Sequence, residues 1–375
     1  MPDSPVRYVR VKTEGVPFAP AVRAFGNVGI IGVATPPANP PADFLPPNVP
    51  HLFTDVNEAR RIATGALGEA VATALVQEPG PSEVWGVRLA QANAYDDALT
   101  KMGTVNVQLV LFAGTALTLT TPTGGQPTPT PAIVKLAEHV TAPVADGMER
   151  IGVAMLAKGA ADPAVVVGSL VTERMVYVAH KSDEDVAAAV AGTIAGHEPH
   201  VSLLLKKVKV RSEAFSAQDL IKLNGSEAAN GPAGQGVNWL VDPPLIPGAG
   251  VYLGEGYTGD PRGKKYIDIV RTVDDITFRL KARLIGTIGN LRISRSGLRG
   301  LVAEMETVLE PLRRAEVIEA YEIVVPILAL LDKPQRTPTE DQLVQAAQTE
   351  RAAEAMVRVD YAGAIHRINI TLKFD

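Results

Sequence analysis

Two histidines three residues apart form the first pattern in the sequence that could do chemistry. The segment His197-Glu-Pro-His200 supplies two imidazoles and a carboxylate, which are common ligands of zinc. The spacing differs from the i, i+4 pair of a zinc protease helix, and Pro199 prevents a regular helix through the segment. We therefore interpret it as a turn that follows a helix ending near Ile194, and we predict no metal site.

The other candidate patterns also have structural explanations. The glycine-rich segments 231–236 and 248–254 do not join a strand to a helix that carries Lys-Ser/Thr, as a phosphate-binding loop would. Asp274 and Asp275 are neighbours on a helix and point in different directions, so we expect a solvated or partner-facing side rather than a shared proton. Ser294 precedes a helix, where capping explains it. We predict no catalytic residue and no cofactor, and hence a protein that is not an enzyme.

Composition narrows the class of protein further. The 375 residues carry 36 basic and 41 acidic side chains, a formal net charge of −5, which argues against a dedicated nucleic-acid binder. We interpret the short basic run 206–211 as a solvated or interfacial strand edge. The sequence contains no cysteine, which excludes disulfides, a thiolate nucleophile and cysteine-ligated metals.

Targeting signals and membrane spans are not expected. The N-terminus lacks the basic start and apolar run of a secretory signal. The most apolar stretches, 107–119 and 321–331, are shorter than the ~20 residues that cross a bilayer. We expect a soluble protein that is assembled in the cytoplasm and does not itself insert into a membrane.

Strands alternate with helices over the first half of the chain. The run 28–34 is apolar throughout, as in a strand buried on both faces, and Asp55 with Glu58 predicts the start of a helix that ends near Thr64. This alternation predicts an α/β domain over residues 25–211 with a largely parallel sheet. The other elements predicted in it are strands over 83–89, 107–112, 151–156, 175–179 and 201–205 and helices over 67–75, 133–140, 164–171 and 183–194, the last with Ser182 as N-cap.

The second half of the chain is predicted to form a connector and a further domain. Residues 212–256 are rich in turn-forming residues and indicate the connector. Residues 257–375 indicate an α+β domain with a mixed sheet. The elements predicted in this domain are two amphipathic helices over 269–284 and 298–312, a strand over 321–331, and a helix capped by Thr337 and Glu340 that ends near Met356.

Both ends of the chain have the alternation of half-buried strands. Residues 6–13 form such a pattern, and residues 14–24, with one glycine and two prolines, read as an extended arm. The last ten residues alternate as strictly. No local turn folds the first strand back, so it must pair at long range, either in its own subunit or in another.

Several segments follow one another in an informative order. The strand Val28-Gly-Ile-Ile-Gly-Val-Ala34 is followed by the helix after Asp55 and by Val84-Trp-Gly-Val-Arg-Leu89. Further along come the small-residue helix turn Ala191-Gly-Thr-Ile-Ala-Gly196 and the G-x-N segment Gly236-Val-Asn-Trp-Leu240. Lys265-Tyr-Ile-Asp-Ile-Val-Arg271 and the closing strand 365–374 complete the order. Over nearly the whole chain, this order resembles that of contractile tail sheath proteins of phages and related injection machines.

The sequence departs from that family in two ways. The family often has paired arginines at the start of the first C-terminal helix, whereas this chain has only Arg271 there. The chain also lacks room for the large inserted outer domains of long sheaths. It therefore resembles a compact, minimal sheath protein.

The resemblance implies partners and a location. Sheath subunits stack as six-fold rings around a tail tube, so the implied partners are further copies of the chain, the tube protein, and baseplate and tail terminator proteins. The implied location is a virion tail or a contractile injection particle, whose contraction drives the tube through a target envelope. No nucleotide is needed on the subunit itself.

The resemblance also implies roles for named residues. The C-terminal domain, as the inner and tube-facing one, would take strands from neighbouring subunits into its sheet, and residues 25–211 would form the outer domain. One face of the helix 266–284 would meet the tube, with Arg279 and Arg283 as tube-facing residues. The residues implied in strand exchange are Arg7, Tyr8, Val9, Arg10 and Val11 at one end and His366, Ile368, Ile370, Leu372 and Phe374 at the other.

Two other classes of protein fit the same elements. An α/β enzyme that binds a nucleotide or small molecule would use the carboxyl edge of the parallel sheet. A non-contractile assembly protein of similar fold would form rings or filaments in a single state.

Overall fold

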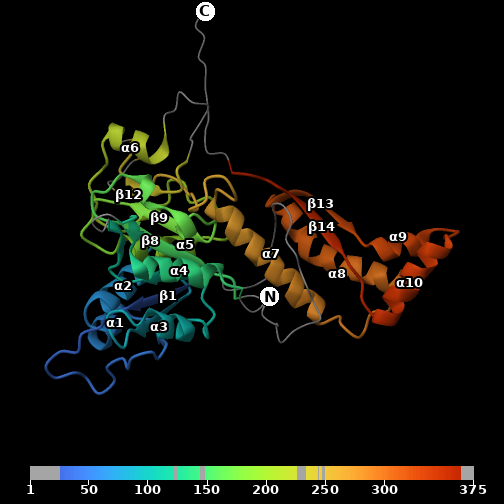
Figure 1. The fold of residues 1–375 in the computed structure, drawn as a ribbon, viewed down its shortest axis with the longest axis horizontal. Helices are drawn as coiled ribbons and strands as arrows, with labels where there is room; N and C mark the ends of the chain where they lie inside the picture. The colour runs from blue at the N-terminus through green and yellow to red at the C-terminus, as the bar shows by residue number, and fades with distance from the viewer. Residues whose placement is uncertain are drawn as a thin grey trace, which may run out of the picture. The chain divides into compact units, whose positions relative to one another are not determined.

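The chain forms two compact units. The computed structural model describes residues 26–120, 125–143, 148–225, 234–243, 245–246 and 250–364. We call residues 26–270 the sheet unit and residues 271–364 the C-terminal unit, and the division falls within helix α7 (Ile267–Ile285). Figure 1 colours the sheet unit from blue to yellow and the C-terminal unit in orange and red. The predicted terminal strands and the arm 14–24 lie outside the described residues.

A single sheet of ten strands organises the sheet unit. Its central strands run parallel in the order β11-β9-β8-β4-β1-β3, with β5 also parallel to β8. Antiparallel strands border them, with β2 beside β3 at one side and β12 followed by β10 at the other. The bounds are β1 (Asn27–Gly32), β2 (His51–Phe53), β3 (Glu83–Arg88), β4 (Leu109–Phe112), β5 (Ala116–Leu117), β8 (Ile151–Leu156), β9 (Met175–Ala179), β10 (Lys207–Val208), β11 (Asn238–Val241) and β12 (Val251–Leu253).

Helices cover both faces of this sheet because its strands are apolar on both sides. In β1, Val28 and Ile30 belong to the apolar cluster that includes α1, α2 and α5, whereas Ile31 belongs to the cluster that includes α3 and α4. A small hairpin of β6 (Leu119–Thr120) and β7 (Thr128–Pro129) is separate from the sheet. The helices are α1 (Val56–Ile62), α2 (Ala66–Leu75), α3 (Tyr95–Met102), α4 (Pro131–Thr141), α5 (Val186–Gly196) and α6 (Ala217–Asn224).

Helix α5 is buried on almost every side. Of its residues, only Gly196 is not fully buried, and most are alanine, glycine or valine. A Cβ atom on Gly192 would lie 2.6 Å from the carbonyl oxygen of Ala74 in α2. The small-residue turn 191–196 therefore lets two helices approach closely. The N-cap is Asp185 rather than the predicted Ser182, because the Asp185 carboxylate accepts a hydrogen bond from the Ala188 N–H.

Two predicted elements of the sheet unit were wrong. The expected helix over 164–171 is two short 3₁₀ turns, Pro163–Val165 and Gly168–Leu170, because Val166 and Val167 between them are extended. The expected strand over 201–205 is irregular, and Leu205 adopts a left-handed φ, of 54°. The segment 212–256 contributes α6, β11 and β12 to the sheet unit.

The C-terminal unit is a small α+β structure around one apolar cluster. A two-stranded antiparallel ribbon, β13 (Ile318–Val324) with β14 (Met356–Tyr361), packs against α8 (Arg295–Arg314) and the rest of α7. Tyr321 and Ile323 of β13 face Val359 and Val357 of β14 on the packed side. The unit is completed by α9 (Pro326–Asp332) and α10 (Pro338–Glu350).

Proline and capping residues explain where the strand β13 and the helices α9 and α10 begin and end. The predicted strand over 321–331 ends at Val324, because Pro326 opens the short helix α9. The predicted capping box is confirmed, since Thr337 and Glu340 exchange side-chain and backbone hydrogen bonds at the start of α10. Helix α10 ends at Glu350 rather than near Met356, because Arg351 is left-handed.

Candidate functional site

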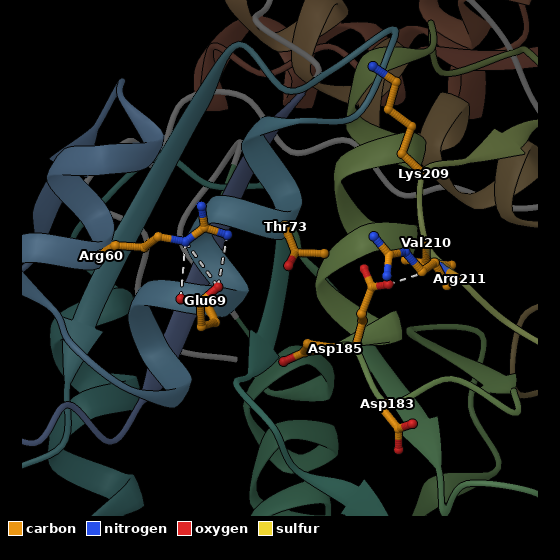
Figure 2. A pocket seen from close by; sticks show the side chains of 9 residues that line it. Arg60, Glu69, Thr73, Asp183, Asp185, Lys209, Val210 and Arg211 are labelled. Atoms are coloured by element: carbon orange, nitrogen blue, oxygen red, sulfur yellow. Dashed lines mark hydrogen bonds and ion pairs between the residues drawn. The ribbon is translucent and has the colours of Figure 1, made fainter.

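A charged pocket lies beside the carboxyl ends of the parallel strands. It has a volume of about 690 Å³. Parallel α/β sheets bind ligands at this edge, so the pocket is where the enzyme alternative would place its site. Figure 2 shows the side chains that line it: Arg60, Glu69, Thr73, Asp183, Glu184, Asp185, Lys209, Val210 and Arg211.

The helix N-termini at this edge already have acceptors from the chain. The Asp185 carboxylate accepts hydrogen bonds from the N–H groups of Ala188, at 2.9 Å, and Gly114, at 2.6 Å. It thus occupies the place at α5 where the phosphate of a nucleotide would bind. At α2, the Leu67 N–H donates to the Val33 carbonyl at 3.1 Å. Both helix ends therefore serve the fold itself.

Ion pairs take up much of the pocket's charge. Arg60 binds Glu69 through two nitrogens, and Lys158 lies 2.6 Å from Asp183. These two ion pairs are largely exposed and each contributes at most about 1 kcal/mol. The backbone N–H of Arg211 donates a hydrogen bond to the Glu184 carboxylate. Nearby His180 is buried, which lowers its pKa. Its Nδ1 accepts from the Ser182 N–H and its Nε2 lies 3.0 Å from the Leu156 carbonyl, so its role is structural.

One edge of the large sheet is closed by a side chain. The Gln77 amide accepts from the Lys209 N–H at 2.8 Å and donates to the Lys209 carbonyl at 3.2 Å, just after β10. It also accepts from the Thr193 hydroxyl of α5 at 3.2 Å. Lys209 itself pairs with Glu78. A two-residue strand that contains Lys207 and is followed by a capped backbone is a poor template for another strand.

The G-x-N segment has a structural explanation. Asn238 is fully buried in β11, and its Nδ2 donates to the carbonyls of Tyr177, at 3.1 Å, and Tyr257, at 2.8 Å. Its Oδ1 accepts from the Tyr257 N–H at 2.6 Å. Gly236 has a left-handed φ of 75° just before it. Asn238 thus joins β9 to the chain that follows β12.

The ribbon of the C-terminal unit has open edges. Within residues 271–364, β13 and β14 pair only with each other. One face packs on the apolar cluster, and on the other Met356, Arg358 and Asp360 are exposed. An unpaired strand edge offers a row of backbone donors and acceptors to an added strand.

The two arginines predicted to face the tube have different surroundings. Arg279 is 7 % exposed and its Nε lies 2.8 Å from Asp275, one turn earlier on α7. Asp274 is also buried, so the solvated alternative expected for this acidic pair was wrong, while the partner-facing alternative stays a prediction. Arg283 is about half exposed and lies 2.5 Å from Glu304 of α8. The tube-facing role of both arginines stays a prediction.

The remaining sequence candidates have local roles. His197 follows the last residue of α5 and its Nδ1 lies 2.8 Å from the Thr193 carbonyl, while His200 lies 3.6 Å from Glu198. Ser294 caps α8, as predicted, by accepting from the Gly297 N–H. The ten residues implied in strand exchange lie outside the described residues.

Neither a metal cluster nor a membrane-spanning helix is found among the described residues. No group of three or more histidine or acidic side chains among them is arranged to hold a metal ion. In the same part of the chain, no helix has the length and apolar character needed to cross a bilayer.

Comparison with solved structures identifies the fold. A chain of the six-fold symmetrised anti-feeding prophage baseplate matches with a TM-score of 0.64 at 12 % identity over 100 % of both chains. A chain of an extracellular contractile injection system, the PVC sheath complex in its contracted state, matches with 0.65 at 11 % identity over 100 % of this chain and 98 % of that one. The sheath tail protein of Desulfitobacterium hafniense matches with 0.53 at 12 % identity, over 85 % and 92 %.

No protein-family model and no curated protein matches the sequence. The likeness to solved structures therefore identifies the fold alone, and it does so over the whole length of the chain. This protein has the fold of contractile sheath proteins.

Proposed function

We propose that this chain is a structural subunit of a contractile sheath. The observation that carries the proposal is the likeness to the contracted PVC sheath complex, which extends over 100 % of this chain. Both compact units are therefore included in the match. The side-chain contacts at the carboxyl edge of the sheet support a structural role, because Asp185 and the ion pairs around it serve the fold.

In the proposed assembly, subunits stack as six-fold rings around a tail tube. The match to a chain of a six-fold symmetrised baseplate supports this symmetry and a baseplate partner. The tube protein and a tail terminator are further proposed partners, in a tail or injection particle. Contraction converts an extended array to one with larger buried interfaces, and this difference in free energy drives the tube forward without a nucleotide on the subunit.

Strand exchange between subunits holds the proposed rings together. Residues 7–13 and 367–374 are the exchanged strands, and residues 14–24 form the arm that lets rings rotate without separating. The open ribbon β13-β14 supports this proposal as the acceptor, because the β10 edge of the large sheet is short and closed by Gln77. Each backbone hydrogen bond to an added strand contributes about 0.5–1.5 kcal/mol.

Deletion of residues 1–15 tests the assembly directly. The purified full-length chain is expected to form rings or tubes in electron micrographs, and the deletion variant is expected to remain as separate subunits. A variant that deletes the same number of residues from the exposed loop 36–50 is less suitable, because Leu45 there is buried. The matched control is therefore a chain in which residues 7–13 are shuffled. Tubes of normal length and stability from the deletion variant would refute the exchange.

A further inference from the structure

The N-terminal end of helix α8 carries an excess of positive charge, because few acidic side chains lie near its arginines. Arg295 Nε lies 3.7 Å and Arg299 Nη2 lies 3.1 Å from the same oxygen of Asp332. One carboxylate thus faces two guanidinium groups, whose side chains are 55 % and 65 % exposed. Arg292, just before the helix, is also exposed and contacts only the Gly289 carbonyl, at 3.4 Å, among the described residues. Arg295 Nε also donates to the Leu331 carbonyl at 2.5 Å, so Asp332 is the one acidic partner of these three arginines within the described residues.

This arrangement is unfavourable within a single subunit. The N-terminus of a helix carries a partial positive charge, so acidic side chains stabilise the first turn and basic ones destabilise it by about 0.3–1 kcal/mol each. The first turn of α8 contains no acidic residue and begins with Arg295. Arginines at this end of α8 lower the stability of the isolated subunit, and a contact with another molecule would compensate for that cost.

Near the other end of α8, the three glutamates Glu310, Glu316 and Glu319 outnumber the two arginines Arg313 and Arg314 by one charge. Glu316 and Glu319 lie in the corner between α8 and β13, are exposed, and form no ion pair with the described residues. Glu310 pairs with both Arg313, at 2.7 Å, and Arg314, at 3.1 Å, so Glu316 and Glu319 hold the remaining acidic charge. We call Glu316 and Glu319 the acidic corner, and Arg292, Arg295 and Arg299 the arginine end.

The two charged ends cannot meet within one molecule. Helix α8 has 20 residues, so at 1.5 Å per residue its ends are about 30 Å apart. The helix is continuous between them, and a charge pair at that distance is screened by physiological salt. Only another molecule can bring a cationic end to an acidic corner.

We propose that the arginine end of α8 binds the acidic corner of a second copy of the chain. The contact is head-to-tail, uses a different patch on each partner, and so extends into an open array rather than a closed pair. It rests on the proposed function, because it is a contact between sheath subunits. Charge complementarity of this kind sets the register of partners and the rate of association, and it weakens as salt increases.

Reciprocal charge reversal tests the contact. The variants are R295E/R299E and E316K/E319K, with K101E/K222E as a control that reverses two exposed lysines of the sheet unit. Each of the first two variants is expected to raise the concentration needed for polymer formation at low salt by about tenfold or more. The control is expected to polymerise like the wild type. Sedimentation of polymers over a range of salt concentrations measures the effect.

Mixing the two variants gives the decisive result. In a one-to-one mixture, the end of α8 made acidic in R295E/R299E can bind the corner made basic in E316K/E319K. The unchanged arginine end of E316K/E319K can bind the unchanged acidic corner of R295E/R299E. Polymers are therefore expected to return to near the wild-type level. The same recovery is expected from a single chain that carries all four substitutions. Melting temperatures establish that each variant is folded, and R295Q/R299Q replaces the reversal if R295E/R299E does not fold.

The outcomes separate this inference from the proposed function. If the wild type forms no polymer under any condition, the proposed function fails. If the wild type polymerises and both reversal variants do so equally well, or if the mixture is no better than its components, the contact between the arginine end and the acidic corner is refuted and the sheath proposal stands.

Discussion

The side-chain amide of Gln77 hydrogen-bonds both backbone groups of Lys209, 132 residues further along the chain. One amide thus supplies a donor and an acceptor to the backbone of one residue, as a neighbouring strand would. The same amide accepts from Thr193, so one buried residue links α2, α5 and the edge of the sheet.

Replacement of Gln77 by leucine should destabilise the sheet unit. The variant leaves the Lys209 N–H and carbonyl without their partners, and each unsatisfied buried group costs about 1–3 kcal/mol. We expect a loss of about 2–4 kcal/mol in the free energy of unfolding, measured by urea denaturation. Gln91→Leu in an exposed loop is the control and should change it by less than about 0.5 kcal/mol. Equal stability of the two variants would contradict the role given to Gln77.

Replacement of Asn238 should lower the free energy of unfolding at least as much as replacement of Gln77. Asn238→Leu is close in size but removes two donors and one acceptor at a fully buried position. We expect a loss of about 3 kcal/mol or more, or failure to fold. Asn39→Leu, at an exposed loop position, provides the comparison. A melting temperature for Asn238→Leu within a degree of the wild type would show that the G-x-N segment has another purpose.

Two glycine-to-alanine substitutions in helices should act in opposite directions. At Gly192, the new Cβ would lie 2.6 Å from a backbone carbonyl oxygen, so we expect a loss of about 1–3 kcal/mol. At Gly300 in α8, the nearest atom is a leucine methyl group at 3.3 Å, which can move. Gly300→Ala should therefore be neutral or stabilise by up to about 1 kcal/mol. Thermal unfolding of the two variants distinguishes the outcomes, and a stabilised Gly192→Ala would contradict the close packing of α5.

Stability should fall as the pH falls below about 6.5, partly because of His139. Burial and the nearby Arg150 lower the pKa of His139 to about 4 from its usual 6.5. Between these values the unfolded chain binds a proton that the folded chain excludes, so acidification favours unfolding. His139→Leu should flatten the dependence of melting temperature on pH between about 5 and 6.5. His200→Gln is the control, and an unchanged slope in His139→Leu would contradict this assignment.

Arg283 gives the cleanest test of a tube-facing helix. Its side chain is 51 % exposed, whereas reversal of buried Arg279 would disturb the subunit itself. Arg283→Glu should reduce binding of the sheath subunit to tube protein several-fold. Arg61→Glu in the sheet unit, whose side chain is 52 % exposed and also loses one exposed pair, is the matched control and should bind like the wild type. Co-sedimentation with purified tubes measures both, and equal binding would count against the contact.

Local patterns in the sequence predicted most elements of the fold. The apolar runs of β8 and β9 are bounded by polar and turn residues, and their predicted bounds are confirmed. The strand expected over 321–331 was wrong because a seven-residue apolar helix and a strand look alike, although Pro326 marks the helix start. Left-handed residues such as Leu205 leave no signal in composition.

The candidate site was less predictable because its contacts join distant segments. No periodicity connects Gln77 to Lys209, and the resemblance pointed to Asn238 without giving its partners. One signal was available and not used: Asp275 and Arg279 are four residues apart on a helix, a spacing that favours an ion pair.

The short strands at the two borders of the large sheet limit aggregation by strand pairing. β2 has three residues and β10 has two, and both are antiparallel additions to a parallel core. Newly made chains therefore have little opportunity to fuse sideways into amyloid-like fibres through these borders. In the proposed assembly, growth by strand pairing is left to the ribbon β13-β14.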